Sequence, residues 1–559
     1  MAKLLASIAW DWTLVWTAIG VYVAYNVVYF FYRLHQVRSL VREIPAKYGI
    51  PIMPHSYLFG HLVTVAKVMM KQPSDIFGGC APLFVIKAYP ELAAAGAMYM
   101  DMWPVSPPML TVFDPDMMAQ FCQEPSLPKA ELMHTEFGPF TQLKDLVNLE
   151  GPDWKRWRGV FNPGFSAKNL LSLVPTFLEE IEVFVGHLQA LAKSGEVVKF
   201  EEPAMDLTID VIGRAALGAR LHAQTKHNGF KDAMTRQVYW LETDRLPVTL
   251  LKLVNPFRPL MMWLHNRTMK NYFMPLIEQS IAEHSSSSQA DTTNTTTGPK
   301  TIISLATKAY LSDPALDAKK STQIDAEFLN VLISQLKIFM FAGHDTTATT
   351  LSFAYHLLHT NPSTLAALRA EHTSVFGPDP STASSQIALN PALLNSLPYT
   401  LSVIKETLRL FPPVGSVREG QTNLFLTSPS TGTRYPTAGW MLFSCSFASQ
   451  RWDAVWPRAG EFVPERWLVR DESDPLHVRK NAFRPFELGP RNCIGQELAL
   501  LELKAIMVLT LREMEFESCY GEGAKKVEGD VAYQVKEAGQ VTGHPKGGMP
   551  MRVRLRTGE

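Results

Sequence analysis

The chain has few cysteines, and those that it has are not arranged in pairs. Five cysteines are scattered over 559 residues, with no Cys-x-x-Cys spacing. An odd number without paired spacing argues against a disulfide framework and against a zinc site. Each cysteine could therefore be core filler, half of a disulfide, a nucleophile or a metal ligand. Cys493 is the most unusual, because it lies between Arg491 and Gly495 in the segment FELGPRNCIG, residues 486–495.

The chain also lacks an excess of charge of either sign. Its 53 basic residues balance 53 acidic ones, so nothing indicates the basic face that nucleic-acid binding requires. No Gly-x-Gly-x-x-Gly unit follows a predicted strand, which excludes the usual dinucleotide fingerprint. The hydrophobic fraction of 46%, with 30 Phe and 12 Trp, is enough for a large core.

Long uncharged runs are absent except for one at the N-terminus. Residues 13–32 carry no charge, and at roughly 1.5 Å per residue a helix of this length spans about 30 Å of bilayer. The length argues against a cleaved signal peptide, whose apolar region is only about 7–15 residues long. Aromatic residues stand at both ends of the run, as in an interfacial belt: Trp10, Trp12, Trp16, Tyr29, Phe30, Phe31 and Tyr32.

Basic residues after this run predict its orientation. Arg33, Arg38, Arg42 and Lys47 follow it, and the positive-inside rule places the bulk of the chain in the cytosol. We predict a lumenal N-terminus over 1–12, a transmembrane anchor over 13–32, a Pro-rich linker over 33–55 and one globular domain over 56–559.

Hydrophobic periodicity predicts a mainly α fold with small β-sheets. Helical patterns run over 154–281, 324–360, 399–410 and 496–514. Two short strands are expected around a Pro turn before a helix that begins at Asp114-Pro115, and further strands over 414–448 and at the C-terminus. The polar, low-complexity stretch 284–300 is predicted to be a flexible surface loop.

The surroundings of Cys493 favour a thiolate. Gly489 and Gly495 permit a tight loop and the close approach of a flat ligand. The start of the predicted helix at Gln496 and the charge of Arg491 both stabilise an anionic sulfur. A nucleophile would need a general base, and this stretch contains no His or Asp. A single thiolate suits haem iron better than zinc or an iron–sulfur cluster.

The segment around Cys493 matches Phe-x-x-Gly-x-Arg-x-Cys-x-Gly at every fixed position. It resembles the cysteine-ligand loop of the haem-thiolate monooxygenases, the cytochromes P450. The resemblance implies the cytochrome P450 fold over the catalytic domain and haem b with Cys493 as the axial ligand. It also implies that Arg491 binds a haem propionate, that Phe486 packs beside the sulfur and that Gly495 borders the cofactor.

Other motifs occur in the order that this family has. Glu406 and Arg409, in ETLR, lie on one helical face, and PERW supplies Arg466. By resemblance these three form a buried ionic triad that supports the haem pocket, with Trp467 in place of the commoner Phe. In WKRWR, Trp154 and Arg158 resemble the family's propionate-binding pair, and Arg418 is a further candidate for that role.

The stretch FAGHDTTATT, residues 341–350, lies in the longest predicted helix. Its Ala342-Gly343 pair leaves room for a flat cofactor, and a Thr hydroxyl can bond back to the carbonyl four residues earlier. The stretch is similar to the family's acid–alcohol pattern. By resemblance, Asp345 and Thr346 relay protons toward dioxygen at the haem.

The resemblance implies a monooxygenase of the endoplasmic reticulum membrane, similar to fungal microsomal members that act on secondary metabolites. NADPH would supply electrons through a flavoprotein reductase, with a small haem protein as a further donor, and dioxygen would oxidise an apolar substrate such as a polyketide or terpenoid. Lys155, Arg156 and Lys504 are either a docking face or simply solvated charges. The expected substrate pocket is formed by Phe137, Phe140, Phe339, Val414, Val417 and Val541.

Two alternatives belong to other classes of protein. One is a haem-thiolate isomerase or dehydratase that needs no reductase, and the other is a non-catalytic haem-binding sensor. Neither needs a proton relay, so the intact Asp345-Thr346 pair favours the monooxygenase.

Overall fold

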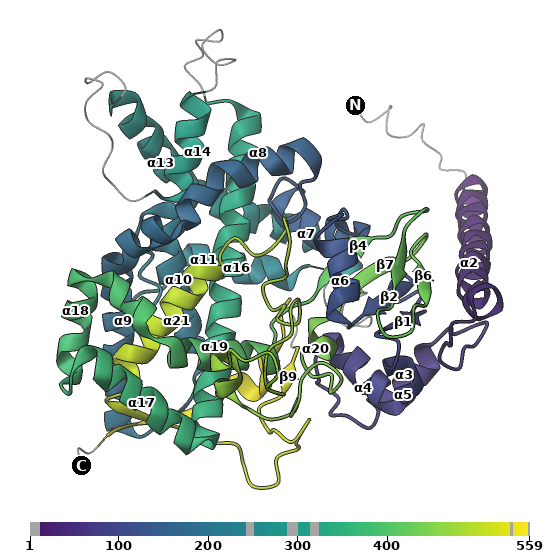
Figure 1. Cartoon of the computed structure of the whole chain (residues 1–559). Coiled ribbons are helices and arrows are strands. Elements are labelled where there is room, and N and C mark those ends of the chain that lie inside the picture. The colour runs from purple at the N-terminus through teal and green to yellow at the C-terminus, as the bar shows by residue number, and fades with distance from the viewer. Residues whose placement is uncertain (1–11, 242–250, 288–299, 313–323, 537–539, 557–559) are drawn as a thin grey trace, which may run out of the picture.

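The computed structural model describes residues 12–241, 251–287, 300–312, 324–536 and 540–556. A large lobe of helices lies beside a smaller lobe built around a four-stranded sheet, and helix α2 stands next to the smaller lobe (Figure 1). The prediction of a mainly α fold with small sheets is confirmed.

Helix α16 (Ala326–Thr360) crosses the middle of the large lobe. Its first turn is capped by Asp325, whose carboxylate accepts a hydrogen bond of 2.9 Å from the N–H of Phe328. It ends where Asn361-Pro362 cannot continue it. Most of its length is buried, and helix α10 (Glu201–Leu217) packs against it.

The remaining long helices surround α16, and the predicted helical patterns agree with them closely. Within the described residues, the predicted stretch 154–281 is helical except for strand β3 (Val197–Lys199) and the segments that join the helices. Residues 242–250 lie outside the described residues. The helices are α8 (Gly151–Phe161), α9 (Ala167–Ser194), α11 (Gly229–Tyr239), α13 (Arg258–Ser287), α14 (Ile302–Leu311), α17 (Pro362–Phe376), α18 (Ala383–Leu389), α19 (Pro398–Leu410) and α21 (Gln496–Thr510). Of the expected loop 284–300, residues 284–287 end α13 and 288–299 lie outside the described residues.

The smaller lobe is organised by a sheet of order β1-β2-β7-β4. Its strands are β1 (Ala97–Met100), β2 (Met109–Val112), β7 (Met441–Ser444) and β4 (Ser416–Glu419); only the β2–β7 pairing is parallel. The expected strand pair before Asp114 is thus confirmed, and the Asp114 carboxylate caps α6 (Pro115–Cys122). Helices α3 (Leu62–Met69), α4 (Ala81–Ala88) and α5 (Pro90–Ala93) cover this lobe.

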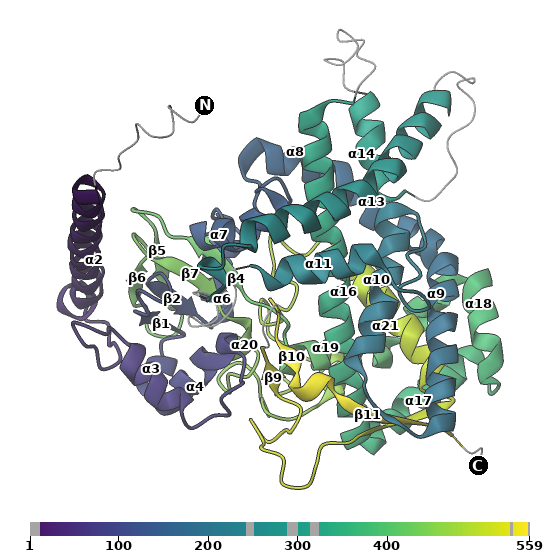
Figure 2. The same ribbon diagram turned by 180° about the vertical axis from the view of Figure 1, so that it is seen from behind.

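The remaining strands form one three-stranded sheet and two short pairs. Strand β11 (Pro550–Leu555) lies between β3 and β8 (Met514–Ser518), and β5 (Phe425–Thr427) pairs with β6 (Arg434–Pro436). The short pair β9 (Gln534–Val535) and β10 (His544–Pro545) lies beside α16 (Figure 2).

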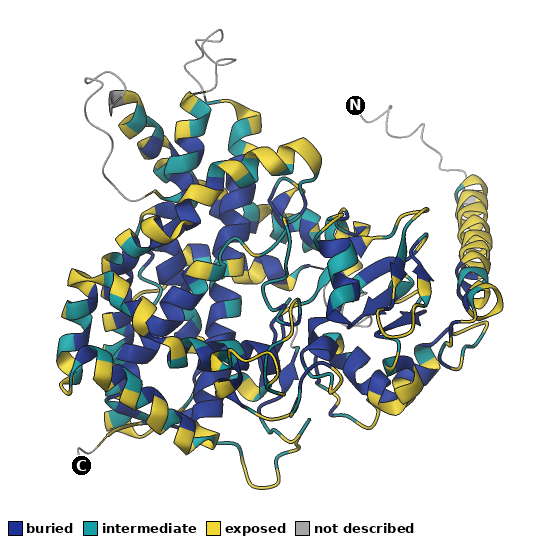
Figure 3. Ribbon diagram, in the orientation of Figure 1, coloured by how far each residue is buried: buried dark blue, intermediate teal, exposed yellow. Residues whose placement is uncertain are grey.

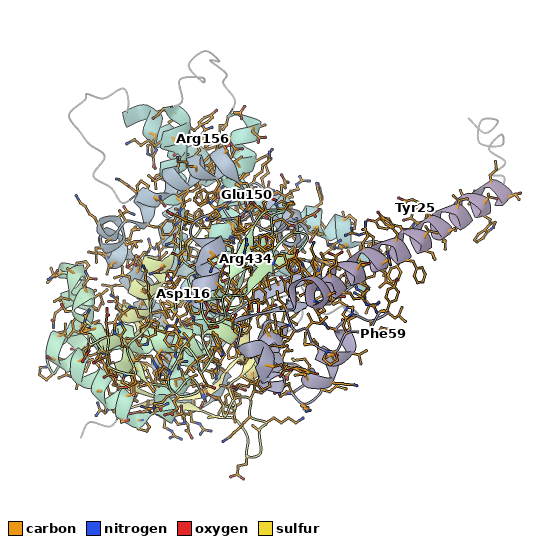
Figure 4. All side chains as sticks on the ribbon, turned by 45° about the vertical axis from the view of Figure 1, so that its right-hand side comes forward. Tyr25, Phe59, Asp116, Glu150, Arg156 and Arg434 are labelled. Atoms are coloured by element: carbon orange, nitrogen blue, oxygen red, sulfur yellow. The ribbon has the colours of Figure 1, made fainter. Side chains whose placement is uncertain are left out.

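Helix α2 (Trp12–Tyr48) is far longer than the predicted anchor. Its N-terminal turns, which carry Tyr25, project away from the body and are exposed on all sides (Figures 3 and 4). Its length and composition would allow it to cross a membrane. Helix α16 is also long and apolar, but 67% of its most apolar window is buried, so α16 is a core helix.

The predicted Pro-rich linker over 33–55 is wrong for residues 33–48, which continue α2 through Pro45. Four apolar residues of this part, one to each turn, are buried against the sheet lobe: Leu34, Val37, Val41 and Ile44. This one-sided spacing was a helical signal that the neighbouring prolines obscured.

A buried arginine fixes the base of α2 to the sheet lobe. Arg38 is fully buried, pairs with the Asp101 carboxylate, and donates to the carbonyls of Tyr57 and Leu58 at 3.0 Å each. Nε2 of His55 lies 2.8 Å from the second carboxylate oxygen of Asp101. A buried charge is tolerated only when it is paired and fully hydrogen-bonded, so this cluster holds the helix at a set angle to the domain.

Only the part of α2 that precedes residue 33 should therefore be removable without loss of the fold. Deleting residues 1–32 should leave a folded domain with an unchanged melting temperature, whereas Arg38→Ala should lower the free energy of unfolding by about 3–5 kcal/mol, because Asp101 is left buried without its main partner. Arg42→Ala, one turn further at an exposed position, is the control. An aggregated product after deletion of 1–32 would contradict the assignment.

Candidate active site

A cavity of about 790 Å³ lies between the middle of α16 and the loop that carries Cys493. Its wall includes five of the six residues predicted for the substrate pocket: Phe137, Phe339, Val414, Val417 and Val541. The sixth, Phe140, is not part of this wall. It is fully buried behind it, with its ring 6.0 Å from that of Phe341, because helix α7 (Glu131–Thr141) turns Phe137 and not Phe140 toward the cavity.

The Cys493 loop is held by backbone contacts that only glycine allows. The N–H of Cys493 donates to the carbonyl of Phe486 at 2.8 Å, and both residues line the cavity. Gly489 has φ +92°, and a Cβ there would lie 2.4 Å from the carbonyl oxygen of Cys122. Any side chain at residue 489 would therefore displace the loop. At Gly495, which precedes α21, the nearest atom to a Cβ would be the Cys493 sulfur at 3.8 Å.

The positive charge of Arg158 acts on the sulfur of Cys493. Burial raises the pKa of the Cys493 thiol, while the N–H groups of Gly495 and Gln496 and the charge of Arg158 act in the opposite direction. The side chain of Arg158 donates to the carbonyl and to the side-chain oxygen of Asn492 at 3.0 and 2.9 Å. The predicted contribution of Arg491 to this charge stays a prediction.

Arg491 faces the edge of the cavity. It pairs with Glu150, and its guanidinium lies 4.5 Å from the centre of the Trp154 ring. Trp154 thus supports an arginine, and the predicted pair Trp154 and Arg158 acts at two different places in the site.

Buried cations outnumber anions at this edge. Arg418 is fully buried and donates to the Ser416 hydroxyl at 2.6 Å and to the Val417 carbonyl at 3.1 Å, but its Nε and one Nη have no hydrogen-bond partner in the described part of the chain. Lys129 lies 3.3 Å from the same hydroxyl, and burial together with the charge of Arg418 lowers its pKa to about 7. Glu150 balances only one of these cations, Arg491, and the two carboxylates of a haem fit the remaining charge.

Lys129 is a site residue that the sequence motifs did not indicate. It stands alone between Pro128 and Ala130, with no periodic or charge pattern around it. Only the fold brings it to Ser416 and Arg418, which follow it by almost 300 residues.

The acid–alcohol stretch of α16 divides between two environments. The Thr346 hydroxyl donates to the carbonyl of Ala342 at 3.0 Å, as predicted for a Thr bonding back along the helix, and Ala342 is exposed to the cavity. Gly343 also lines the cavity, so its predicted role beside the cofactor stays a prediction, and it has a second role in packing. A Cβ there would lie 2.6 Å from Cγ1 of Ile212, so glycine is needed for the close packing of α10 on α16.

Asp345 is an ionised group in a buried network. Burial raises its pKa, but the charge and hydrogen bond of His544 outweigh burial and hold the pKa at about 2. Its two oxygens face the Thr542 hydroxyl at 2.5 Å and the His544 ring at 3.3 Å.

Glu406, Arg409 and Arg466 come together as predicted and are fully buried. The two arginines donate to the Glu406 carboxylate at 2.8–3.0 Å. Trp467 donates its indole N–H to the same carboxylate at 3.0 Å. The Trp that replaces the usual Phe therefore adds a fourth member to the triad.

The three candidate docking residues are not equivalent. Lys155 and Arg156 are exposed on α8 (Figure 4). Lys504 is buried, and its ammonium donates to the carbonyl of Leu394 at 2.8 Å. Its place in the docking face is therefore wrong.

Comparison with known proteins agrees with this geometry. A model of the family described as Cytochrome P450 matches residues 90–539. The cytochrome P450 monooxygenase polC of Polytolypa hystricis is 35% identical over 552 residues, which cover 96% of this chain and 95% of that protein. The cytochrome P450 monooxygenase acrF of Aspergillus aculeatus is 31% identical, covering 87% and 99%. The corresponding ptmG of Penicillium ochrochloron is 26% identical, covering 95% and 94%.

Breaking the Glu406 cluster should unfold this region first. Glu406→Gln should lower the free energy of unfolding by about 3–5 kcal/mol, because two buried arginines lose their anion. Trp467→Phe should lower it by about 1.5–3 kcal/mol through loss of one hydrogen bond to a charged group. Denaturant unfolding measures both.

Trp440→Phe is the matched control, since Trp440 is fully buried and its indole nitrogen has no hydrogen-bond partner among the described residues. Equal losses of stability for Trp467→Phe and Trp440→Phe would show that the bond to Glu406 contributes nothing.

Proposed function

Because this chain belongs to the cytochrome P450 family, and the similar proteins polC and acrF are monooxygenases, we propose that it oxidises an apolar secondary metabolite with dioxygen and NADPH. Electrons would reach it from a membrane-bound flavoprotein reductase, with a small haem protein as a second donor. One observation carries the proposal: a lone thiol, Cys493, two cations, Lys129 and Arg491, and the acid–alcohol pair line the same cavity.

The residues of the cavity fit haem b. Cys493 would hold the iron through its sulfur, and Lys129, Arg418 and Arg491 would bind the propionates, with Arg491 supported by the Trp154 ring. Phe486 would pack against the ring beside the sulfur. When bound, the haem supplies the iron chemistry that activates dioxygen.

Thr346 and Asp345 provide the protons that the reaction consumes. The Thr346 hydroxyl lines the cavity opposite the Cys493 loop, and its proton is held on the carbonyl of Ala342. Asp345, one residue earlier, is the acid that returns a proton to this place. A positioned acid of this kind contributes typically 10²–10⁴-fold to a rate.

The lining of the cavity indicates a large apolar substrate with one polar group. Phe165, Ile212 and Phe341 add to the apolar wall, which suits a terpenoid or polyketide skeleton. Glu136 of α7 is a polar residue in this otherwise apolar part of the wall, and burial raises the pKa of its carboxyl to about 7. Near neutral pH the carboxyl thus retains a proton for a large part of the time, and can donate a hydrogen bond to a substrate hydroxyl or carbonyl.

Helix α2 would anchor the protein in the endoplasmic reticulum membrane with the catalytic domain in the cytosol. The basic residues that follow the apolar turns support this orientation. The exposed pair Lys155 and Arg156, on the helix that also carries Arg158, would belong to the docking face for the reductase.

Replacement of the thiolate tests the cofactor assignment. Cys493→Ser should lose the red-shifted Soret band of the ferrous carbon monoxide complex, because only a thiolate ligand produces it. Cys519, which follows strand β8, is half-buried and does not line the cavity, so Cys519→Ser should keep the band. Survival of the band in Cys493→Ser would refute the ligand assignment.

Replacement of the alcohol tests the reaction class. With a compound found by a spectral binding screen, Thr346→Ala should keep its haem but form at least about tenfold less product per NADPH, with the difference recovered as hydrogen peroxide. Ser352→Ala is the control, because the Ser352 hydroxyl also bonds back along α16, to the Ala348 carbonyl at 2.9 Å, but is fully buried away from the cavity. Oxygen uptake that no compound in a broad panel stimulates would favour an isomerase or a haem sensor.

A further inference from the structure

A histidine of the C-terminal strand pair lies between two carboxylates that come from different helices. His544, in β10, is 1% exposed. Its Nδ1 lies 2.7 Å from the carboxylate of Glu201, in the first turn of α10, and its Nε2 lies 3.3 Å from the carboxylate of Asp345. Thr349 of α16 donates to the same Glu201 oxygen at 3.1 Å. The resemblance to the family had indicated Asp345 but none of these partners.

Both ring nitrogens of His544 face carboxylate oxygens, so both must carry hydrogen for the contacts to be favourable. Burial lowers the pKa of His544, but the two carboxylates outweigh burial and raise it to about 10. Two further groups face the cluster. Burial keeps His344 on α16 neutral by lowering its pKa, and burial keeps Tyr520 neutral by raising its pKa. The imidazolium is thus the charge that balances the two acids.

Thr542 completes a continuous path from the histidine to Asp345. Its hydroxyl lies 3.0 Å from Nε2 of His544 and donates to Oδ2 of Asp345 at 2.5 Å. Both distances are within hydrogen-bond range, whereas the direct distance of 3.3 Å from His544 to Asp345 is longer. Thr542 also lines the cavity, next to Val541. Figure 2 shows β10 beside α16, where this path lies.

We propose that Thr542 and His544, supported by Glu201, are positioning residues that return a proton to Asp345 after each delivery of a proton into the cavity. The inference rests on the proposed monooxygenase function. The Nε2 proton of His544 passes to Oγ1 of Thr542 as the hydroxyl proton of Thr542 passes to Oδ2 of Asp345. The neutral imidazole that remains keeps its Nδ1–H on Glu201, and a proton from water restores the imidazolium.

This step moves one proton and no electrons, and the net charge of the group stays the same. Asp345 and Glu201 begin ionised beside a cation, and the step leaves a neutral acid, a neutral imidazole and the Glu201 carboxylate. Glu201 therefore holds the ring in one orientation and stabilises the charged form that is needed for the next step.

The chain offers an isosteric test at Thr542. Thr542→Val removes the hydroxyl but keeps the shape, whereas Thr542→Ser keeps the hydroxyl. With the purified reductase and NADPH, oxygen uptake by Thr542→Val should be at least about tenfold slower than by wild type. Its rate should also fall more strongly when H₂O is replaced by D₂O, because proton transfer becomes limiting. Thr542→Ser should restore both values.

His544→Gln should behave like Thr542→Val, since glutamine can fill the site but cannot supply the proton. The matched control is His356→Gln. His356 lies on α16, as Asp345 does, and like His544 it is 1% exposed. It contacts Asp530 at 2.7 Å and Ser518 at 3.0 Å, but it does not line the cavity. It should lose stability without a change in the solvent isotope effect. Equal rates and isotope effects for Thr542→Val and Thr542→Ser would overturn the proposal.

Failure of the proposed function would look different. If the haem-loaded wild-type protein takes up no oxygen with reductase and NADPH, the proposed monooxygenase function is contradicted. The contact between His544 and Asp345 is not. A double-mutant cycle of melting temperatures with Asp345→Asn and His544→Gln then decides the pairing, because additive effects would show that the two side chains do not interact.

Discussion

The buried carboxylate of Glu406 is the contact on which the rest of the site depends. It accepts hydrogen bonds from Arg409, Arg466 and Trp467, and also from the backbone N–H of Val463 at 3.0 Å. Arg409 in turn donates to three backbone carbonyls between residues 450 and 461. This carboxylate therefore joins helix α19 to the long irregular segment that leads to Cys493. A segment with so little regular structure has few other means of keeping one conformation.

Charge is separated across the cavity. At one edge Lys129, Arg418 and Arg491 leave positive charge without a matching number of acids, which suits the carboxylates of a cofactor. Beside α16 the excess is negative, because Asp345 and a second acid share the single cation of His544. The two groups of charges are built from side chains far apart in the chain. Each group meets one requirement of the proposed reaction. The cations would bind the anionic cofactor, and the groups beside α16 would supply protons.

Much of the fold and the core of the site could be predicted because their signals are local. Helix α16 ends where Asn361-Pro362 stops a long apolar pattern, and the Cys493 loop follows a fixed spacing. What could not be predicted depends on tertiary contacts. Lys129 and His544 stand in no motif and acquire partners only through folding. The prediction of a linker over residues 33–48 was wrong because the nearby prolines indicated a break, although the spacing of the apolar residues indicated a helix.

The central claim is that this cavity inserts one atom of dioxygen into an organic molecule. Turnover with NADPH, reductase and a substrate from the binding screen, under dioxygen labelled with heavy oxygen, tests it directly by mass spectrometry. We expect one labelled oxygen atom in each new hydroxyl group of the product. Product without the label, or with oxygen that comes only from water, would contradict the account.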